Sequence, residues 1–552
     1  MMISAILVST IGFAALEPST ALLKLSGEFW AWRATTQPVS ADDIPRIDRP
    51  AGWVPDWSKG SVALRRLVLA RFEARWSAID TAGWSVPDQV DYRLTGSALA
   101  RVRWELDLNP GWRRDPNFYV QQTLGSLFEV LVLPPPLDAG RRQAVLLRLR
   151  NIPRVAGQAE ANLDLAVKPF AERAIDALGG ARVALTTMAR EVGDLGGATD
   201  SAIVALERFR DHLKRRLPSM PAGTAVGPDK YRWFLSRVAL VPFSADEMLA
   251  MGRQEWERSV AFEALETAKN RGLPELPIFP TLEANIAAEA ADEAQVRRFL
   301  EEKRLVTVPA WVKHYLNAPV PPYLAPLAWL GVPDDLTGPA RLDRDGVHYI
   351  PNPGPDLGYF GRSMAKDPRG IIAHEGIPGH YFQMVLSWAH ENPIRRRFYD
   401  SGPNEGIGFY AEEMMLQEGL FDDRPRSKEI IYNFMRLRAL RVEVDVRLAT
   451  GEFTVLKAAD YLRRTVPMDP ETALQEASDF AAGPGQAITY QIGKLQITKL
   501  LADAKRQQGD RFDLRAFHDF VWKNGNVPLA LVRWELLGLR DEVARIDRNR
   551  RP

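Results

Sequence analysis

The 552-residue chain contains no cysteine, which excludes disulfide bonds, thiol nucleophiles and a lipid-modified N-terminal cysteine. Its net charge is only +1 at pH 7, so nothing in the overall charge favours nucleic acid or an acidic membrane as a partner. Apolar residues make up 46% of the sequence. A chain of this length and composition can bury a large core, which excludes an intrinsically disordered protein.

Long apolar runs are also scarce. The stretch from Ile3 to Leu16 is apolar but shorter than the roughly 20 residues that a membrane-spanning helix needs. The small residues Ser19-Thr20-Ala21 follow, a pattern compatible with signal-peptide cleavage after Ala21, although no lysine or arginine precedes the apolar stretch. The alternative is a packed N-terminal helix. We therefore expect no stable membrane span, and the compartment, cytoplasmic or exported, stays open.

Much of the remaining sequence has the spacing of apolar and charged residues that is typical of helices. The ranges with this pattern are 61–80, 143–178 and 182–216, the last interrupted at 193–197. Ser244 and Glu247 form a capping-box-like start for another helix. Prolines interrupt helix at 274–280 and over 317–355, and we expect the second region to supply loops and a small β-sheet. The sequence thus predicts a mainly α fold.

Residues 373–380, Ala-His-Glu-Gly-Ile-Pro-Gly-His, carry two histidines and a glutamate. Hydrolysis of an amide near neutral pH needs a Lewis acid, an activated water and a general base, and these side chains supply most of that chemistry. His374 and His380 are six residues apart, so a regular helix would separate them by about 120° and about 9 Å. Because the Pro-Gly pair before His380 disfavours a regular helix, we predict a helix that is bulged or broken over 377–379 and returns His380 to the same side.

A third metal ligand is required, because catalytic zinc normally takes three protein ligands. Glu405 and Glu412 lie seven residues apart in a segment that begins with a turn and becomes helical, so they share one face. One acid on this face can bind the metal, and the other can orient a ligating imidazole. Gly406 and Gly408 weaken the helix beside Glu405 as if room were needed. The alternatives are that the two histidines pack in a helical core and that Glu412 and Glu413 form a solvated helix face.

With these motifs the chain resembles the bacterial family called domain of unknown function 885. Its members carry a His-Glu-x-x-Pro-Gly-His core, a Glu-Gly-Trp-Ala-Leu-Tyr-Ala-Glu-like segment and a Pro-Gly-Gln-Ala-x-x-Tyr-x-x-Gly-Lys segment. The matching residues are 374–380, 405–412 and 484–494. The resemblance implies a large, helical, bilobed body similar to zinc peptidases of the thermolysin-like and neurolysin-like kind, with a small β-sheet beside the active-site cleft. This chain departs from the family pattern at Ile407, where tryptophan is expected, and at Tyr381, where a second histidine is usual.

The last of these segments offers a group for stabilising an oxyanion. If a helix begins at Pro484, then Gln486, Tyr490 and Lys494 recur every four residues on one face. The Tyr490 hydroxyl or the Lys494 ammonium would supply the electrostatic stabilisation that usually dominates acyl-transfer catalysis, and Gln486 is a candidate substrate contact. Alternatively, Tyr490 caps a core cluster and Lys494 pairs with a surface acid.

His348 is a second candidate substrate contact. It lies in a predicted strand over 345–350, where thermolysin-like enzymes present a sheet edge to peptides. The alternative is an ordinary strand residue. We expect His518 to pack beside a helix end, with a hydrogen bond into the site as the alternative. The other histidines are interpreted as surface or packing residues: His212, His314 and His390.

These observations predict a mononuclear zinc hydrolase, a peptidase that cleaves short peptides or an amide-containing small molecule. His374, His380 and Glu405 are expected to bind the ion. Glu375 would activate the bound water, and Glu412 would support a ligand from behind. Manganese, cobalt or iron could replace zinc in a site with two imidazoles and one carboxylate.

Two other functions are compatible with the sequence. The first is a metal-dependent enzyme that does not cut peptides, such as one with lyase or condensation chemistry in the processing of a secondary metabolite. The second is a catalytically silent, metal-stabilised binding or scaffold protein. Glu375 favours an enzyme over a scaffold, because a structural zinc site closes with four ligands and needs no adjacent base.

We expect three divisions of the chain. Residues 1–21 are a signal or N-terminal helix, residues 22–310 form a helical N-terminal lobe, and residues 311–552 form the catalytic, metal-binding lobe. The cleft between the lobes is expected to use both of them. The oligomeric state is open.

Overall fold

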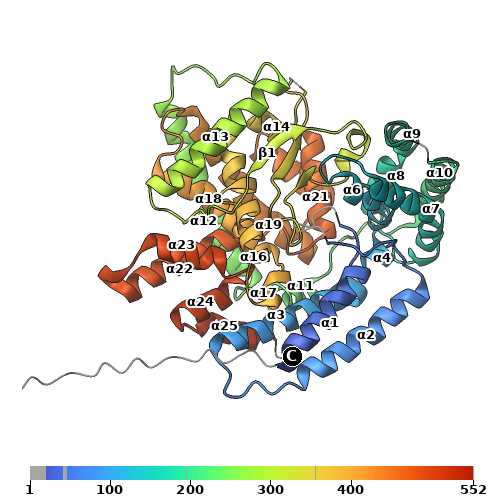
Figure 1. Cartoon of the computed structure of the whole chain (residues 1–552), viewed down its shortest axis with the longest axis horizontal. Helices are drawn as coiled ribbons and strands as arrows, with labels where there is room; N and C mark the ends of the chain where they lie inside the picture. The colour runs from blue at the N-terminus through green and yellow to red at the C-terminus, as the bar shows by residue number, and fades with distance from the viewer. Residues whose placement is uncertain (1–19, 41–46, 194, 355, 551–552) are drawn as a thin grey trace, which may run out of the picture.

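The computed structural model describes residues 20–40, 47–193, 195–354 and 356–550 (Figure 1). The expected signal or N-terminal helix at 1–21 lies almost wholly outside these residues. The prediction of a mainly α fold with a small sheet is confirmed. None of the described helices is both long and apolar enough to cross a bilayer.

The described residues between 20 and 302 form helices and loops. The longer helices are α1 (Thr20–Thr36), α2 (Lys59–Ser77), α3 (Val86–Arg103), α7 (Ala139–Asn162), α8 (Lys168–Gly179), α9 (Ala181–Val192), α10 (Ala198–Arg216), α11 (Pro228–Arg237), α12 (Ala245–Lys269) and α13 (Leu282–Glu302). The short ones are α4 (Gly111–Arg114), α5 (Pro116–Val120), α6 (Ser126–Leu131), the π-helical η1 (Trp104–Leu108) and η2 (Gln121–Gly125), and the 3-10 helix η3 (Leu217–Ser219).

The remainder contains the small sheet and a second set of helices. The strands are β1 (Tyr315–Pro319), β2 (Asp334–Asp335) and β3 (Gly346–Ile350), and the short helices are the 3-10 helices η4 (Ala325–Leu330) and η6 (Gly509–Arg511), α14 (Tyr359–Met364), α15 (Arg369–Ile371), the π-helical η5 (Ile372–Gly376) and α17 (Pro393–Arg397). The others are α16 (His380–Trp388), α18 (Ser401–Glu418), α19 (Arg426–Thr450), α20 (Val455–Thr465), α21 (Pro470–Ala482), α22 (Thr489–Gln508), α23 (Leu514–Lys523), α24 (Leu529–Leu537) and α25 (Asp541–Asn549).

Local sequence signals account for several of these boundaries. The Ser244 side chain accepts a hydrogen bond from the Glu247 backbone while the Glu247 side chain accepts one from the Ser244 backbone, so the predicted capping box at the start of α12 is confirmed. The predicted interruption at 193–197 separates α9 from α10. Gly193 has φ +102°, a conformation that strongly favours glycine, and this explains why the helix ends there.

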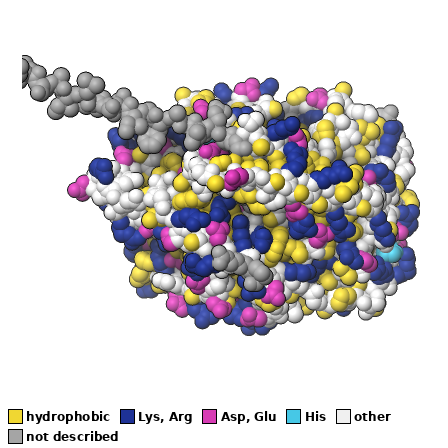
Figure 2. Space-filling model, turned by 90° about the horizontal axis from the view of Figure 1, so that it is seen from below, with side chains coloured by type: hydrophobic (Ala, Val, Ile, Leu, Met, Phe, Trp, Pro, Cys, Tyr) yellow, Lys and Arg dark blue, Asp and Glu magenta, His cyan; other side chains and the backbone are white. Residues whose placement is uncertain are grey.

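The central helices α18 and α19 lie in the middle of the molecule, with α7 to α10 on one side and α22 to α24 on the other (Figure 1). Helix α12 packs along α19, and α18 packs along α22. The largest apolar cluster runs from Leu22 to Ile546 and so includes residues from both sides of the predicted boundary at 310. On the face in Figure 2, basic, acidic and apolar side chains are interspersed.

The three-stranded sheet has the order β1-β3-β2. Strand β3 pairs in parallel with β1, with Tyr315 opposite Gly346, and antiparallel with β2, with Asp334 opposite His348. A Cβ atom at Gly346 would lie 2.8 Å from the Tyr315 ring, so only glycine fits there. The Tyr315 ring stacks on Tyr381 of α16 with centroids 5.6 Å apart, and this contact joins the sheet to the helix that follows the His-Glu-Gly-Ile-Pro-Gly-His motif.

A buried histidine ties α23 to α18. His518 has no exposed surface, its Nδ1 lies 2.7 Å from the Leu305 carbonyl oxygen, and its Nε2 lies 2.9 Å from the Tyr410 hydroxyl. A neutral imidazole satisfies both contacts, with Nδ1–H donating to Leu305 and Nε2 accepting from Tyr410. Burial lowers the pKa of His518 to about 4. The expectation that His518 packs beside a helix end is met at Leu305, which lies three residues after the end of α13, and the other hydrogen bond goes to Tyr410 of α18.

We predict that His518 makes stability depend on pH. Its folded-state pKa is about 4, below the unfolded value of about 6.5, so the unfolded state binds more protons between these values. The stabilisation is complete above about pH 6.5 and falls by up to about 1.4 kcal/mol per pH unit towards pH 4. Urea unfolding at several pH values should show a shallower pH dependence for His518→Phe than for the native protein. Equal slopes in the two proteins would contradict the assignment.

Candidate metal centre

The two motif histidines come together because the chain breaks between them. His374 lies in the π-helix η5, which ends at Gly376, and His380 is the first residue of α16. A Cβ atom at Gly379 would lie 1.7 Å from the His374 carbonyl oxygen, so this return path requires glycine. The Trp522 indole donates a hydrogen bond of 2.6 Å to the Pro378 carbonyl and holds the turn. The predicted break over 377–379 is confirmed, and the two imidazole centroids are 4.6 Å apart.

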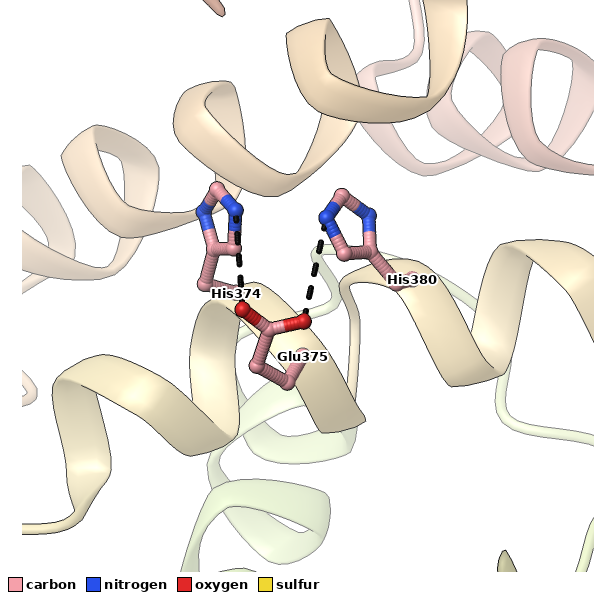
Figure 3. Close-up of side chains that lie close together, drawn as sticks. All are labelled: His374, Glu375 and His380. Atoms are coloured by element: carbon pink, nitrogen blue, oxygen red, sulfur yellow. Dashed lines mark ion pairs between the residues drawn. The ribbon is translucent and has the colours of Figure 1, made fainter. Parts of the chain in front are cut away.

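Glu375 lies below the two imidazoles (Figure 3). Its carboxylate oxygens are 4.0 Å from His374 Nε2 and 3.8 Å from His380 Nε2. One ligand atom from each of the three side chains lies within 4.8 Å of the others. This buried His-Glu-His group could therefore bind a metal ion.

A second carboxylate lies closer to the same two nitrogens. Glu405 Oε2 is 3.3 Å from His374 Nε2 and 3.3 Å from His380 Nε2. Two ligand atoms that each lie about 2.0–2.1 Å from a tetrahedral zinc are about 3.3 Å from one another. The Glu405 oxygen is buried and has no hydrogen-bond partner among the described residues, so a cation between the three side chains would satisfy it. The donor set of two imidazoles and one carboxylate fits zinc.

The two carboxylates differ in their access to solvent. The Glu405 side chain is 6% exposed and the Glu375 side chain is 24% exposed. Glu405 is therefore suited to hold a metal, whereas Glu375 has room for a water molecule beside it.

Glycines let α18 approach the imidazoles. A Cβ atom at Gly408 would lie 2.9 Å from His374 Cε1 and 3.0 Å from His380 Cε1. On the other side of the helix, a Cβ atom at Gly406 would lie 2.8 Å from Gly493 Cα in α22. The expectation that these glycines make room beside Glu405 is confirmed. The helix begins at Ser401, so the turn expected before Glu405 is helical instead.

Glu412 supports His374 from the side opposite the candidate ion. Its Oε1 lies 2.7 Å from His374 Nδ1, and its Oε2 accepts a hydrogen bond of 2.7 Å from the Arg438 guanidinium. The alternative of a solvated face is wrong for this residue, because Glu412 has no exposed surface. Arg438, which was not among the predicted site residues, lies in α19 and also reaches His374 Nδ1 at 3.3 Å. The available signal was an arginine on the same helix face as the apolar residues Phe434, Met435 and Val442.

Electrostatics in the cluster reflect these contacts. Burial and Arg438 oppose protonation of His374, but Glu405 and Glu412 prevail and raise its pKa to about 9. Burial alone would raise the pKa of Glu405, yet His380 and His374 hold it well below its usual range. A metal ion must displace a proton from His374, because only the unprotonated nitrogen is a ligand.

Tyr490 reaches the cluster from α22. Its ring stacks on His374 with a centroid separation of 6.1 Å and an interplanar angle of 12°. The expected helix start at Pro484 is wrong, because α22 begins at Thr489 and Gln486 lies in the preceding turn. That turn is fixed by Asp445, whose carboxylate accepts hydrogen bonds from the backbone of Gly485 at 2.9 Å and of Ala487 at 2.8 Å. Because the backbone N–H groups of Gly485 and Ala487 bind the buried Asp445 carboxylate, these residues form a turn and not the first turn of the helix.

Lys494 is committed to an ion-pair network. Its ammonium lies 2.8 Å from the Glu255 carboxylate and 2.7 Å from the Glu413 carboxylate, and it sits 4.6 Å from the centroid of the Phe409 ring. The alternative in which Lys494 pairs with acids therefore describes its contacts. Its partners are not at the surface, since the side chains of Glu255 and Glu413 are only 11% and 16% exposed.

His348 lies in β3, as predicted, but this strand is central and not an edge. Both of its sides are paired, so its backbone cannot add a peptide strand, and the edges are β1 and β2. The His348 ring stacks on Tyr315 with centroids 6.2 Å apart, and Tyr315 donates a hydrogen bond of 3.1 Å to Asp334. Burial lowers the pKa of His348, although Asp334 and Glu375 oppose this effect.

The remaining histidines lie elsewhere in the described structure. His314 Nδ1 is 3.0 Å from a Glu293 oxygen, and His390 Nδ1 accepts a hydrogen bond of 2.9 Å from the Asn392 backbone. His212 lies on α10. These positions agree with surface or packing roles.

The fold and the cluster define a mainly helical protein with a buried group that could bind a metal ion. The chain belongs to the family described as "Bacterial protein of unknown function (DUF885)", whose profile matches residues 38–536. The resemblance seen in the motifs is thereby confirmed, whereas the likeness to zinc peptidases stays a prediction.

Two solved structures are similar over nearly the whole chain. One is titled "The structure of a putative lipoprotein of unknown function from Shewanella oneidensis", with 17% identity, a TM-score of 0.71 and coverage of 95% of this chain and 100% of that chain. The other is "the putative lipoprotein from Colwellia psychrerythraea", with 16% identity, a TM-score of 0.71 and coverage of 96% and 98%. At these identities the likeness shows the fold alone. No curated protein matches the chain.

Both departures from the family pattern are buried. Ile407 and Tyr381 are each 1% exposed. Tyr381 packs on Tyr315 of the sheet, so its ring fills space between α16 and β1.

We predict that Gly408→Ala weakens metal binding. The new Cβ would press on both imidazoles, and such overpacking costs about 1–3 kcal/mol, so the affinity for zinc should fall about 10-fold or more. Gly157→Ala in α7 is the matched control, because a Cβ there meets nothing within 4 Å. Competition with a chelating dye measures both affinities. Equal affinities in the two variants would contradict the proposed packing.

We also predict that Arg438 tunes the affinity through Glu412. Loss of a group that orients a metal-binding imidazole typically lowers metal affinity about 10- to 100-fold, and Arg438→Gln should fall in this range. Arg436→Gln in the same helix is the control, since Arg436 pairs with Glu263 instead. If both variants bound zinc like the native protein, Arg438 would have no such role.

Proposed function

We propose that this protein is a zinc-dependent hydrolase, a peptidase that cleaves short peptides or an amide-containing small molecule. One observation carries the proposal: Glu405 is 3.3 Å from both histidine nitrogens, while Glu375 stands farther from them and is more open to solvent. A metal-binding carboxylate and a free carboxylate beside it are what metal-assisted hydrolysis requires.

His374, His380 and Glu405 would hold the ion. When bound, zinc supplies Lewis acidity that polarises a carbonyl and acidifies a water molecule. Glu412, whose Oε1 lies 2.7 Å from Nδ1, would accept the Nδ1 proton and so favour the tautomer with Nε2 free for the ion, and Arg438 holds Glu412 in place. The charge pair also prevents rotation of the ring.

Glu375 is the proposed general base. It is within 4.0 Å of both ligand nitrogens but remains partly exposed, so it can hold a water molecule at the site and take its proton. The same carboxylic acid can then deliver the proton to the leaving amine. One side chain can carry out both transfers because Glu375, directly after the first histidine, lies close to both ligand nitrogens.

Tyr490 is the better candidate for stabilising the oxyanion. Its ring lies against His374, and the guanidinium of Arg441 lies 4.5 Å from the ring centroid. The Lys494 ammonium is occupied by two carboxylates, so its use would leave both acids without their partner. We therefore assign the role to the Tyr490 hydroxyl.

The proposal gives different roles to the two predicted lobes of the chain. All three proposed metal ligands lie in 311–552, and this half also holds Glu375 and Tyr490. The half at 22–310 contributes Glu255 of α12, which forms an ion pair with Lys494. We propose that this half is the scaffold and that His348 and Gln486 contact the substrate.

Two substitutions should separate metal binding from catalysis. Glu375→Gln should retain zinc and lose about 100-fold or more in kcat/KM, because a missing general base typically costs about 10²–10⁴-fold. Glu405→Gln should lose both zinc and activity. Glu391→Gln, at an exposed site, should retain both. Elemental analysis gives the metal content, and a screen of blocked and free di- to pentapeptides gives the activity.

Each outcome of this screen decides between functions. Peptide cleavage that is lost in Glu375→Gln supports the proposal. Zinc binding without cleavage by the native protein would favour a metal-dependent enzyme with another substrate, or a metal-stabilised binding protein. Absence of metal binding by the native protein would overturn the hydrolase assignment.

A further inference from the structure

A cavity of about 790 Å³ shares helix α16 with the proposed metal site. Its walls come from α1, α3, η1 and α5 of the N-terminal half and from α16, α17 and the end of α21. The volume is within the range of about 300–1,000 Å³ that is typical of pockets for small ligands. The side chains of His374, His380 and Glu405 do not line it, so the cavity is distinct from the ion site itself.

Three wall residues each lie four residues along the chain from a residue of the proposed site. Met384 lies four residues after His380 in α16, and Ser401 lies four residues before Glu405 in α18. Residues four apart in a helix lie on the same face about one turn, or about 6 Å along the axis, from each other. Gln486 lies in the turn that leads to Tyr490, also four residues away. Two wall residues, Met384 and Ser401, are therefore each about one helical turn from a proposed ligand.

The walls of the cavity are rich in aromatic rings. They include the rings of Phe29, Trp104, Phe118, Phe234 and Trp388. Two of the arginines in the wall are neutralised, since Arg33 pairs with Glu105 at 2.9 Å and Arg101 pairs with Asp400 at 2.9 Å. A large apolar group would gain from burial here, because most of the surface it meets is aromatic or aliphatic.

We propose that this cavity binds one flank of a peptide substrate and selects an aromatic side chain about two residues from the cleaved bond. The inference rests on the proposed hydrolase function and names its substrate class. An extended chain rises about 3.3 Å per residue, so one helical turn corresponds to about two residues of substrate. The cleaved bond then lies at the ion while the aromatic side chain lies among the rings.

The test uses pentaalanine and five versions of it, each with phenylalanine at one position. With the zinc-loaded native protein, phenylalanine two residues from the cleaved bond should raise kcat/KM at least about 10-fold over pentaalanine. Mass spectrometry of the products identifies the bond. No dependence on phenylalanine position, with pentaalanine cleaved equally well, would overturn the inference and leave the hydrolase intact.

Cavity-filling variants link the preference to the cavity. Ala34→Trp in α1 and Asn117→Trp in α5 place an indole at the wall and should remove the preference while pentaalanine is still cleaved. Ala63→Trp in α2 is the matched control, because it adds an indole at an exposed site outside the cavity, and it should keep the preference. Retention of the preference in both filled variants would overturn the assignment of the cavity.

A binding measurement separates the two hypotheses. Zinc-loaded Glu375→Gln should turn over substrate at least about 100-fold more slowly, so calorimetry can measure binding. The measurement reports whether a phenylalanine-containing pentapeptide binds more tightly than pentaalanine and whether Ala34→Trp removes the difference. Selective binding without cleavage by the native protein would support the cavity and reject the hydrolase. Neither binding nor cleavage would reject both.

Discussion

The centre of this molecule depends on a single carboxylate oxygen placed between two imidazoles. Glu405 Oε2 is equally distant from His374 and His380 and receives no hydrogen bond from the described residues. A buried carboxylate in that position is costly unless positive charge faces it. The surrounding helices must therefore hold three side chains from two separate segments in one place. The break in the helix brings both histidines together, and the glycines of α18 allow Glu405 to approach them.

Close backbone approach is how the fold meets this requirement. Gly406 and Gly493 bring α18 and α22 into contact, and Gly408 leaves room for the imidazole rings. The same packing carries Tyr490 on α22 to the face of His374. Because the acid and the tyrosine sit on helices that touch through their backbones, their separation is fixed by main-chain contact and not by flexible side chains. The main chain thus sets the distance between the two helices that carry these side chains.

Sequence alone could predict the parts of this site that depend on local chemistry. The Pro-Gly pair before His380 indicated a broken helix, and the seven-residue spacing of Glu405 and Glu412 placed both on one face. The capping box at Ser244 was equally local. These features follow from backbone geometry and helical periodicity, which a short window of residues determines.

Features set by tertiary contacts could not be read in this way. The sequence around Arg438 does not indicate that Glu412 is its partner. Likewise, the ion pairs of Lys494 with Glu255 and Glu413 form only when α12 packs against the central helices. The predicted start of α22 was too early because Asp445, which is distant in sequence and lies in α19, accepts backbone hydrogen bonds from the turn before the helix. The central position of β3 depends on β2, a strand too short to have a periodic pattern.

The contacts around His374 also set a charge balance. Glu375, Glu405 and Glu412 bring three formal negative charges to a buried centre, and Arg438 returns one positive charge. Two neutral imidazoles add none. A cation of valence two restores neutrality, whereas a monovalent or trivalent ion would leave a net charge in a region of low dielectric constant. Arg438 does not touch the proposed ion, yet its charge sets the balance that would favour a divalent ion at this centre.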